Sequence, residues 1–353
     1  MVDTAIPKNV CIIRLSAIGD CCHVLPVLRT LQSAWPNARF TWIVGKVEAS
    51  LVGDIPGIDF VVLDKQLGLR AYLAVRRALH GRKFDLLLHM HASMRANLVS
   101  LMVSAPYRLG FDKPRARDRQ WLFTNQQINS QPRQHVLDGL FGFAEHFGVT
   151  ERHMRWDIPL EDSDRAAATQ EIEPDRPMLV ISPCSSQRLR NFRNWSAQHY
   201  AAVAAHATKK YGMQVVLTGG STPLEREYGE HIAALQGEKT INLIGKTTLK
   251  QLLAVLERAT VVLCPDSGPA HMATAVGTPV IGLYATSNPG RTGPYLSERW
   301  VVNKYPEAVE LELGKTVEEL RWGARVRNPR AMNLIEVADV TAKLDQLMAA
   351  AIP

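Results

Sequence analysis

The sequence predicts an α/β protein built from two doubly wound domains with parallel sheets, arranged in tandem. Short apolar runs of strand length alternate with helical stretches along the chain, which is the pattern of βαβ units. The alternation stops at a polar segment, Glu161–Pro177, and restarts at Met178. The 353 residues, 46% of them hydrophobic and 21% charged, suffice for two packed domains. We expect an N-terminal domain at 1–165, a C-terminal domain at 178–333 and a last helical segment at 334–353.

The first half contains five strand candidates with helical segments between them. Each strand candidate is a nearly continuous apolar run, as expected for parallel strands that helices cover on both faces. The strand candidates are Asn9–Leu15, Arg39–Val44, Phe60–Leu63, Phe84–Met90 and Tyr107–Phe111, and the helices include Cys21–Ala34, Leu69–Leu79 and Ser93–Val103. The pattern thins between Asp112 and Gln134, and a further helix is expected at His135–Phe147.

The second half repeats the alternation after the polar segment. Its strand candidates are Met178–Ser182, Gln214–Thr218, Ile241–Ile244, Val261–Cys264 and Val280–Tyr284, and its helices are Ser196–Tyr211, Pro223–Leu235, Leu249–Glu257 and Pro269–Val276. The last helix, Leu334–Ala351, has the option of crossing back onto the first domain. Proteins with two such domains typically bind their ligand in the cleft between them, at the carboxyl ends of the strands.

The positive charge of the chain is concentrated in its first part. The net charge is +7, and residues 1–150 hold 18 Lys and Arg against 11 Asp and Glu, whereas residues 151–353 hold 23 of each kind. This asymmetry favours an anionic partner, such as a phosphorylated lipid surface or a nucleic acid, over a merely solvated basic surface.

The cysteines and the hydropathy of the chain bear on its cellular location. The five cysteines are odd in number and lack the spacing of zinc ligands, which indicates reduced core thiols and the cytoplasm. We find neither a secretory signal at the N-terminus nor a run of 18 apolar residues, so we expect no transmembrane segment.

The turn Arg14–Asp20 follows the first strand candidate and is the first candidate for chemistry. Gly19 permits a tight turn, and a carboxylate at Asp20 can act as a general base toward an acceptor hydroxyl. Position alone favours the alternative that Asp20 is the N-cap of the following helix. The turn lacks the G-x-G-x-x-G pattern, which argues against a dinucleotide-binding dehydrogenase.

The segment Cys264–His271 is the second candidate, because it joins a strand to a helix N-terminus. Asp266 or Ser267 can cap that helix, and Gly268 lets backbone N–H groups approach an anion such as a diphosphate. His271 lies about one turn further along and can reach the same anion. The alternative is an ordinary capped helix with a buried histidine.

Two further segments of the second half and one of the first carry candidate ligand-binding residues. Ser185 and Ser186 precede Arg188, Arg190 and Arg193, and guanidinium groups bind phosphate oxygens in a bidentate manner. Glu225 follows a Gly-rich turn and can bind a ribose or complement a helix dipole. In the first half, the basic loop Lys113–Arg119 predicts an anion site or a flexible loop, and its candidates, with neighbours in sequence, are Arg95, Arg115, Arg117, Arg119 and His135.

Three of these segments together resemble the lipopolysaccharide heptosyltransferases. They are Ser16–Asp20, Asp266–His271 and the long block Gly277–Tyr295, and the similarity extends from about Asn9 to the last helix. Within that family, three parts of the first half are most similar to the enzyme that adds the first heptose to a phosphorylated Kdo on lipid A: Arg14–Asp20, Trp42–Lys46 and Gly110–Trp121.

The resemblance implies a GT-B fold, an ADP-heptose donor and an inverting transfer that requires no metal or other cofactor. It assigns Asp20 as the catalytic base. The donor-binding residues that it implies are Ser185, Ser186, Arg193, Glu225, Asp266, Ser267, Gly268 and His271, with Arg188, Arg190 and Glu227 as alternatives. The acceptor-binding candidates are Lys46, Arg95, Arg115, Arg117, Arg119 and His135. The implied partner is Kdo-lipid A at the cytoplasmic surface of the inner membrane, and the resemblance implies no binding of nucleic acid.

Other functions remain open at this point. One is a related glycosyltransferase that uses another nucleotide sugar or an acceptor that already carries heptose. Another is a nucleotide- or nucleic-acid-binding protein without enzymatic activity, although the chain lacks a P-loop, a zinc finger and an RNA-binding aromatic motif. The segment Tyr305–Asn333 predicts only an insertion with helical parts.

Overall fold

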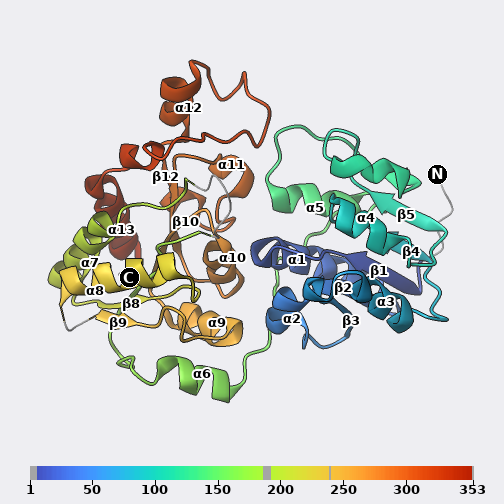
Figure 1. Ribbon diagram of the computed structural model, residues 1–353, viewed down its shortest axis with the longest axis horizontal. Coiled ribbons are helices and arrows are strands. Elements are labelled where there is room, and N and C mark those ends of the chain that lie inside the picture. Colours follow the sequence, from blue (N-terminus) through green and yellow to red (C-terminus); the bar gives the residue numbers. More distant parts are fainter. Residues whose placement is uncertain (1–5, 186–191, 238–239, 352–353) are drawn as a thin grey trace. The chain divides into compact units, whose positions relative to one another are not determined.

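The computed structural model (Figure 1) describes residues 6–185, 192–237 and 240–351. The chain forms two compact units, Met1–Pro159 and Leu160–Pro353. Each unit contains a six-stranded parallel sheet with helices on both faces. The prediction of two doubly wound α/β domains is therefore confirmed.

The first unit has the strand order β3-β2-β1-β4-β5-β6. Its strands are β1 (Asn9–Ile13), β2 (Arg39–Gly45), β3 (Ile58–Leu63), β4 (Leu86–Leu88), β5 (Tyr107–Gly110) and β6 (Gln126–Gln127). Its helices are α1 (Ile18–Ala34), α2 (Lys46–Val52), α3 (Leu69–Ala78), α4 (Met94–Ser100) and α5 (Val136–Glu145), with the short 3₁₀ helices η1 (Lys65–Leu67) and η2 (Arg117–Leu122). Because β1 lies at the centre of the sheet, the turn that leaves it is supported by strands on both sides.

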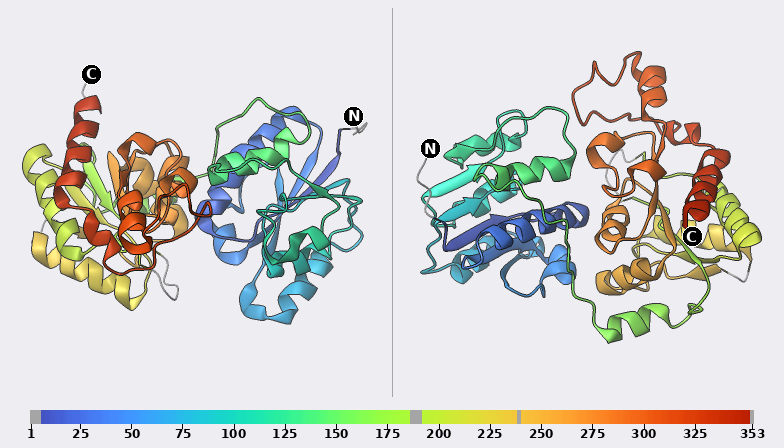
Figure 2. Two further views of the ribbon diagram at one scale, coloured as in Figure 1. Left: turned by 90° about the horizontal axis from the view of Figure 1, so that it is seen from above. Right: turned by 180° about the vertical axis from the view of Figure 1, so that it is seen from behind.

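Two layers of helices cover the first sheet (Figure 2). The inner faces of α3 and α4 share one hydrophobic cluster with the strands, to which Val75 and Val99 contribute fully buried side chains. Helices α1 and α5 pack against each other in the other layer. These burial patterns follow from the helical spacing of apolar residues against continuous apolar strands.

The second unit has the strand order β12-β11-β10-β7-β8-β9. Its strands are β7 (Met178–Ile181), β8 (Gln214–Leu217), β9 (Thr240–Asn242), β10 (Val261–Pro265), β11 (Val280–Tyr284) and β12 (Val302–Asn303). Its helices are α6 (Asp162–Thr169), α7 (Ala197–Tyr211), α8 (Pro223–Gln236), α9 (Leu249–Arg258), α10 (Gly268–Ala275), α11 (Pro289–Thr292), α12 (Tyr305–Leu313) and α13 (Val337–Ala351), with the 3₁₀ helices η3 (Glu298–Trp300) and η4 (Ala331–Leu334). Strands β7 and β10 are neighbours, so the loops that follow them leave the sheet side by side.

The last helix belongs to the second unit, where it packs on α7. The carboxylate of Asp345 in α13 accepts hydrogen bonds of 2.7 Å from His206 Nε2 and from the hydroxyl of Tyr211, and one of 2.8 Å from Lys210 Nζ. This helix therefore packs on the second unit, whereas the sequence also allowed for a crossing back onto the first domain. Its apolar face completes the core that α7 and the second sheet already form.

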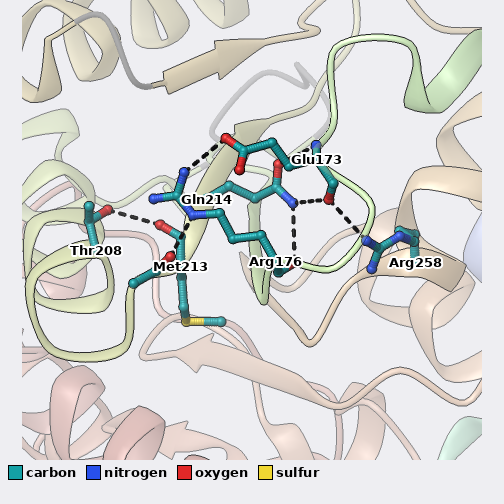
Figure 3. A network of polar contacts seen from close by, with 7 residues as sticks. Glu173, Arg176, Thr208, Met213, Gln214 and Arg258 are labelled. Carbon is teal, nitrogen blue, oxygen red and sulfur yellow. Dashed lines mark hydrogen bonds and ion pairs between the residues drawn. The ribbon is translucent and has the colours of Figure 1, made fainter.

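The domain boundary lies earlier than the expected end at residue 165. Helix α6 packs on α9, and Arg165 in α6 pairs with Glu257 in α9 at 2.8 Å. The polar segment after α6 is also fastened to the second unit (Figure 3), because buried Gln214 donates to the backbone oxygens of Glu173 and Arg176 at 2.9 and 3.2 Å. The first unit therefore ends at Pro159.

All five cysteines are buried free thiols. Burial raises the pKa of Cys22, Cys184 and Cys264 to about 12. The expectation of reduced core thiols is confirmed, and these groups carry no thiolate at neutral pH. Among the described residues, no helix has the length and apolarity to span a membrane.

Candidate active site

Asp20 lies in the first turn of α1, just beyond the carboxyl end of β1. Its Oδ2 accepts a hydrogen bond of 3.1 Å from the backbone N–H of Ala17 and forms an ion pair of 2.6 Å with Arg14 Nη2. The N-cap of α1 is Ala17, so the alternative that Asp20 is the N-cap is wrong. Its carboxylate supports the helix start from the third helical position and also keeps 35% of its side-chain surface exposed.

Arg14 holds this carboxylate in place. Its Nη1 donates to the carbonyl oxygen of Met90 at 2.7 Å and its Nε donates to that of Ser16 at 3.0 Å. The guanidinium is therefore fixed between the turn after β1 and the end of β4, with only 11% of its side-chain surface exposed. The sequence places Arg14 in the turn but does not indicate its role, because an ion pair between residues six positions apart depends on the path of the turn.

A histidine that sequence analysis missed lies beside the same turn. The Nδ1 of His91 accepts a hydrogen bond of 3.1 Å from the backbone N–H of Leu15, which leaves the ring proton on Nε2. Burial, with the nearby charge of Arg14, lowers the pKa of His91 to about 3, so the ring is neutral at physiological pH. Its position directly after an apolar strand was the available signal.

A second carboxylate, Glu48 in α2, lies at the other side of the turn. Burial raises the pKa of Glu48, and the charge of Asp20 adds to the increase. A Cβ at Gly45 would collide with the carbonyl oxygen of Leu15, so this close approach of β2 to the turn requires glycine. The site around Asp20 is thus a compact polar cluster at the carboxyl ends of β1, β2 and β4.

In the second unit, the loop after β10 leads into α10 as predicted. Ser267 is the N-cap residue, but its hydroxyl donates to the carbonyl oxygen of Pro265 at 3.0 Å and does not cap the helix. The first-turn N–H groups, from Gly268 onward, therefore receive no bond from a cap side chain. His271 is buried within the helix, as one alternative expected.

Arg193 joins the loop after β7 to the loop after β10. Its Nη1 donates to the carbonyl oxygen of Asp266 at 2.8 Å and to Oδ2 of the same residue at 3.2 Å. The side chains of Arg193 and Asp266 keep 13% and 8% of their surfaces exposed. Buried Ser185 donates through its backbone N–H to Asn194 Oδ1 at 2.9 Å. The structure thus brings the predicted Ser185, Arg193, Asp266 and Ser267 to two adjacent strand ends.

Four predicted residues contribute differently or fall outside the structure. Glu225 begins α8 through a capping box, since its carboxylate accepts from the N–H of Gly220 at 2.7 Å and from the hydroxyl of Thr222 at 2.5 Å. Glu225 therefore stabilises the start of α8 through specific hydrogen bonds, in addition to any interaction with the helix dipole. This is the structural role that the sequence offered as the alternative to a ribose contact. Ser186, Arg188 and Arg190 lie outside the described residues.

Three of the acceptor-binding candidates have protein partners. Lys46 pairs with Asp64 at 2.8 Å. Arg115 pairs with Asp112 and donates to Gln134 Oε1 at 3.0 Å. His135 is the N-cap of α5, where its Nδ1 accepts from a backbone N–H. The clustered charge at Arg115 is therefore neutralised within the protein, which a sequence pattern of like charges does not reveal.

The other three acceptor-binding candidates are exposed arginines: Arg95, in the first turn of α4, and Arg117 and Arg119, in η2. The backbone of Arg119 has φ 57°, in the left-handed region that residues other than glycine rarely adopt. Among the described residues, no group of three or more His, Cys, Asp or Glu has the arrangement of a metal site.

Comparison with known proteins decides the family. Residues 72–320 match the family model described as "Glycosyltransferase family 9 (heptosyltransferase)". This chain belongs to glycosyltransferase family 9. The lipopolysaccharide core heptosyltransferase OpsX of Haemophilus influenzae is 40% identical to it over 344 residues, which cover 98% of each chain. The resemblance seen in the sequence is confirmed, and family 9 membership makes the chain a glycosyltransferase.

Solved structures of family 9 proteins share its fold. A glycosyl transferase family 9 structure from Veillonella parvula superposes with a TM-score of 0.79 at 21% identity, over 98% of both chains. The ADP-heptose lps heptosyltransferase II of Escherichia coli gives a TM-score of 0.73 at 19% identity, over 97% of this chain and 99% of that one. The fold is GT-B.

Proposed function

We propose that this glycosyltransferase transfers L-glycero-D-manno-heptose from ADP-heptose to a phosphorylated Kdo of lipid A, with inversion at the anomeric carbon. Similarity to a lipopolysaccharide core heptosyltransferase over almost the whole chain supports the heptose and the lipopolysaccharide acceptor. The observation that carries the mechanism is the ion pair of Asp20 with Arg14, in which the carboxylate is the more exposed partner. An enzyme in this role works at the cytoplasmic surface of the inner membrane.

The donor diphosphate is assigned to the second unit. The N-terminus of α10 offers backbone N–H groups and the positive end of a helix dipole, and Arg193 adds a full positive charge beside it. Negative charge grows on the departing diphosphate during the reaction, so fixed donors at this position lower the barrier. These groups take over the charge compensation that a metal ion provides in other transferases, and we propose a reaction without metal.

Asp20 is assigned as the general base. In the reaction, its carboxylate takes the proton of the acceptor hydroxyl, the hydroxyl oxygen forms a bond to C1 of the heptose, and the bond from C1 to the diphosphate oxygen breaks. The attacking and leaving oxygens lie on opposite sides of C1, which inverts the configuration. The ion pair with Arg14 favours the charged carboxylate, the form that a general base requires. General-base catalysis contributes about 10²–10⁴-fold.

The acceptor phosphate is assigned to the exposed arginines of the first unit. Arg117 and Arg119 are exposed and can turn toward an anionic sugar. Arg115 instead stabilises the loop through its ion pair with Asp112. Arg95 follows on the neighbouring helix. Lys46 and His135 are assigned to the same acceptor, and Lys46 exchanges its bond to Asp64 for one to the acceptor.

An assay with purified protein tests this function. ADP-heptose is offered with Kdo-lipid A, with and without phosphate on Kdo, and the product anomer is identified by NMR. We expect faster transfer to the phosphorylated acceptor, a product with inverted configuration and the same rate in the presence of EDTA. ADP-glucose and UDP-sugars serve as control donors, and an acceptor that already carries heptose tests the function of a later heptosyltransferase. Transfer only to that acceptor contradicts the proposed substrate.

A further inference from the structure

Exposed apolar side chains gather on two neighbouring elements of the first unit. Met94, Leu98 and Leu101 recur at helical spacing along the outer side of α4, with exposed fractions of 46%, 41% and 65%. Trp121 and Leu122, at the end of η2, are 41% and 67% exposed. Single exposed apolar residues are ordinary in proteins, but five on two adjoining elements form a patch of the kind that marks an interaction site.

Helix α4 and η2 are fastened together at both ends. At one end, Asp118 in η2 accepts from the backbone N–H of Met94 through Oδ2 and from Asn97 Nδ2 through its carbonyl oxygen, both at 2.8 Å. At the other end, Arg108 donates to the carbonyl oxygens of Ser100 and Phe123 at 2.7 and 2.9 Å. The patch therefore has a defined shape rather than being the surface of a loose loop.

The core holds η2 in the same way. Gln120 is fully buried and donates to the carbonyl oxygen of His89 at 2.8 Å, while its own Oε1 accepts from the N–H of Phe111. The residues on either side, Arg119 and Trp121, remain exposed. A buried amide thus anchors a segment whose flanking arginine and tryptophan face solvent.

The charge around the patch is positive. Arg95, Arg117 and Arg119 lie on α4 and η2, are exposed and have no acidic partner among the described residues. Between residues 65 and 111 the only acidic residue is Asp85, whose carboxylate accepts from the backbone N–H groups of Lys8 and Asn9. In η2 the one acid is Asp118, whose carboxylate accepts from the backbone N–H of Met94, so the three arginines outnumber it. We call the outer side of α4 and η2, with these arginines, the α4–η2 surface.

Helix α3 has the same chemistry on the same side of the sheet as the α4–η2 surface. It shares its core cluster with α4, so both helices turn their outer sides away from the same face of the sheet. On that outer side, Leu69 and Leu73 are 83% and 58% exposed, and Arg70 and Arg77 are exposed beside them.

We propose that the α4–η2 surface docks the enzyme onto an anionic lipid bilayer. Arginine side chains bind lipid phosphates, tryptophan prefers the interface between water and hydrocarbon, and leucine and methionine enter the apolar layer below. A nucleic acid also attracts arginines, but it offers no apolar layer for a stripe of Met94, Leu98 and Leu101. The apolar side chains of this surface lie outside the two candidate substrate sites, whereas Arg95, Arg117 and Arg119 are shared with the proposed acceptor site. Bilayer docking does not depend on which sugar the enzyme transfers.

Helix α12 of the second unit provides a natural control. Leu311 and Leu313 are 70% and 43% exposed, but they alternate with the exposed acids Glu310 and Glu312. An anionic bilayer repels such a surface. The α4–η2 surface and α12 therefore both expose leucine side chains, but the neighbouring charged side chains are mainly basic on the first and acidic on the second.

Flotation of the full chain with lipid vesicles tests the proposal without donor or acceptor. We expect binding to phosphatidylcholine vesicles that contain phosphatidylglycerol, weaker binding at high salt, and little binding to phosphatidylcholine alone. The double variant L98S/L101S should lower the partition coefficient by at least about tenfold, because two apolar side chains no longer enter the bilayer. The matched variant L311S/L313S should leave it unchanged. Both variants should melt at the wild-type temperature and keep their turnover of a water-soluble Kdo acceptor.

Lipids with brominated chains give a second readout. Quenching of tryptophan fluorescence on vesicle binding should diminish in Trp121→Phe, although six other tryptophans remain. Failure of the wild type to bind anionic vesicles overturns the proposal, as does wild-type binding by L98S/L101S. Oligonucleotide binding that depends on Arg117 and Arg119, without vesicle binding, would instead identify a nucleic-acid surface. Loss of heptosyl transfer alone would bear on the proposed function and not on this surface.

Discussion

Each unit contains an arginine–aspartate pair at the carboxyl ends of its central strands, and the two pairs differ in how far their carboxylates are exposed. In the first unit Arg14 is 11% exposed and Asp20 is 35% exposed, so a buried arginine supports an accessible carboxylate. In the second unit Asp266 is 8% exposed and Arg193 is 13% exposed, so neither partner is widely exposed. The difference teaches that the pair of the first unit leaves its carboxylate accessible, as the proposed general base requires, whereas the pair of the second unit joins two loops next to the proposed donor site.

The largest effect should come from the accessible carboxylate. Asp20→Asn keeps the shape of the side chain but cannot accept the acceptor proton, so turnover should fall by about 10²–10⁴-fold. Calorimetric titration should show ADP-heptose affinity within a few-fold of wild type. Asp59→Asn is the control, since Asp59 is also paired with an arginine, Arg82, but lies on β3. Turnover of Asp20→Asn close to wild type would exclude Asp20 as the base.

The second largest effect should come from Arg193. Arg193→Lys keeps the charge but loses the geometry of the guanidinium, and we expect donor affinity and turnover to fall together by about tenfold or more. Calorimetry with ADP-heptose and steady-state rates measure both. Arg165→Lys, at the exposed pair with Glu257, is the matched control. If only the acceptor KM changes, Arg193 does not bind the donor.

A smaller effect should follow from loosening the support of Asp20. Arg14→Lys preserves a cation but cannot make all the bonds to Met90, Ser16 and Asp20. We expect kcat to fall by about tenfold through misplacement of the base, with the donor Kd unchanged. A drop as large as that of Asp20→Asn would mean that Arg14 itself contacts the reacting groups.

The smallest effect concerns acid stability, which should separate the two units. Burial lowers the pKa of His89 and His91 to about 3, so both are neutral in the folded first unit. Because an unfolded histidine takes a proton near pH 6.5, their contribution to stability decreases as pH falls from about 6.5 toward 3.

In the second unit, burial alone would raise the pKa of Asp345, but hydrogen bonds from Lys210, His206 and Tyr211 outweigh it and bring the pKa to about 2. This contribution is present above the unfolded value near 4 and is lost only as pH falls from there toward 2. Hydrogen exchange between pH 7 and pH 4 should therefore show the core of the first unit losing protection before α13 does. The reverse order would contradict this assignment of the buried histidines.

The sequence predicts the longer strands well, because a parallel strand covered on both faces needs a continuous apolar run, as at Val261–Cys264 and Val280–Tyr284. It does not predict the two-residue edge strands β6 and β12, which have no such run. It predicts the place of α13 poorly. An amphipathic helix shows that it has an apolar face, but not which of two exposed cores that face covers.

The candidate site shows the same division. The loops that bear Asp20, Arg193 and Ser267 follow apolar strands, so their positions at strand ends are readable from the sequence. The hydrogen bonds and ion pairs of these residues cannot be read from the sequence. That Arg14 supports Asp20, or that Asp112 neutralises Arg115, depends on turn geometry that residue order alone does not determine.

The burial of every cysteine has a practical consequence. Since the thiols lie in the interior and remain protonated at neutral pH, maleimides and nitroxide reagents have no native target on the folded enzyme. A cysteine introduced at a single exposed position, such as Leu98→Cys, would then be the unique labelling site. The wild-type chain is already a suitable background for distance measurements by electron spin resonance.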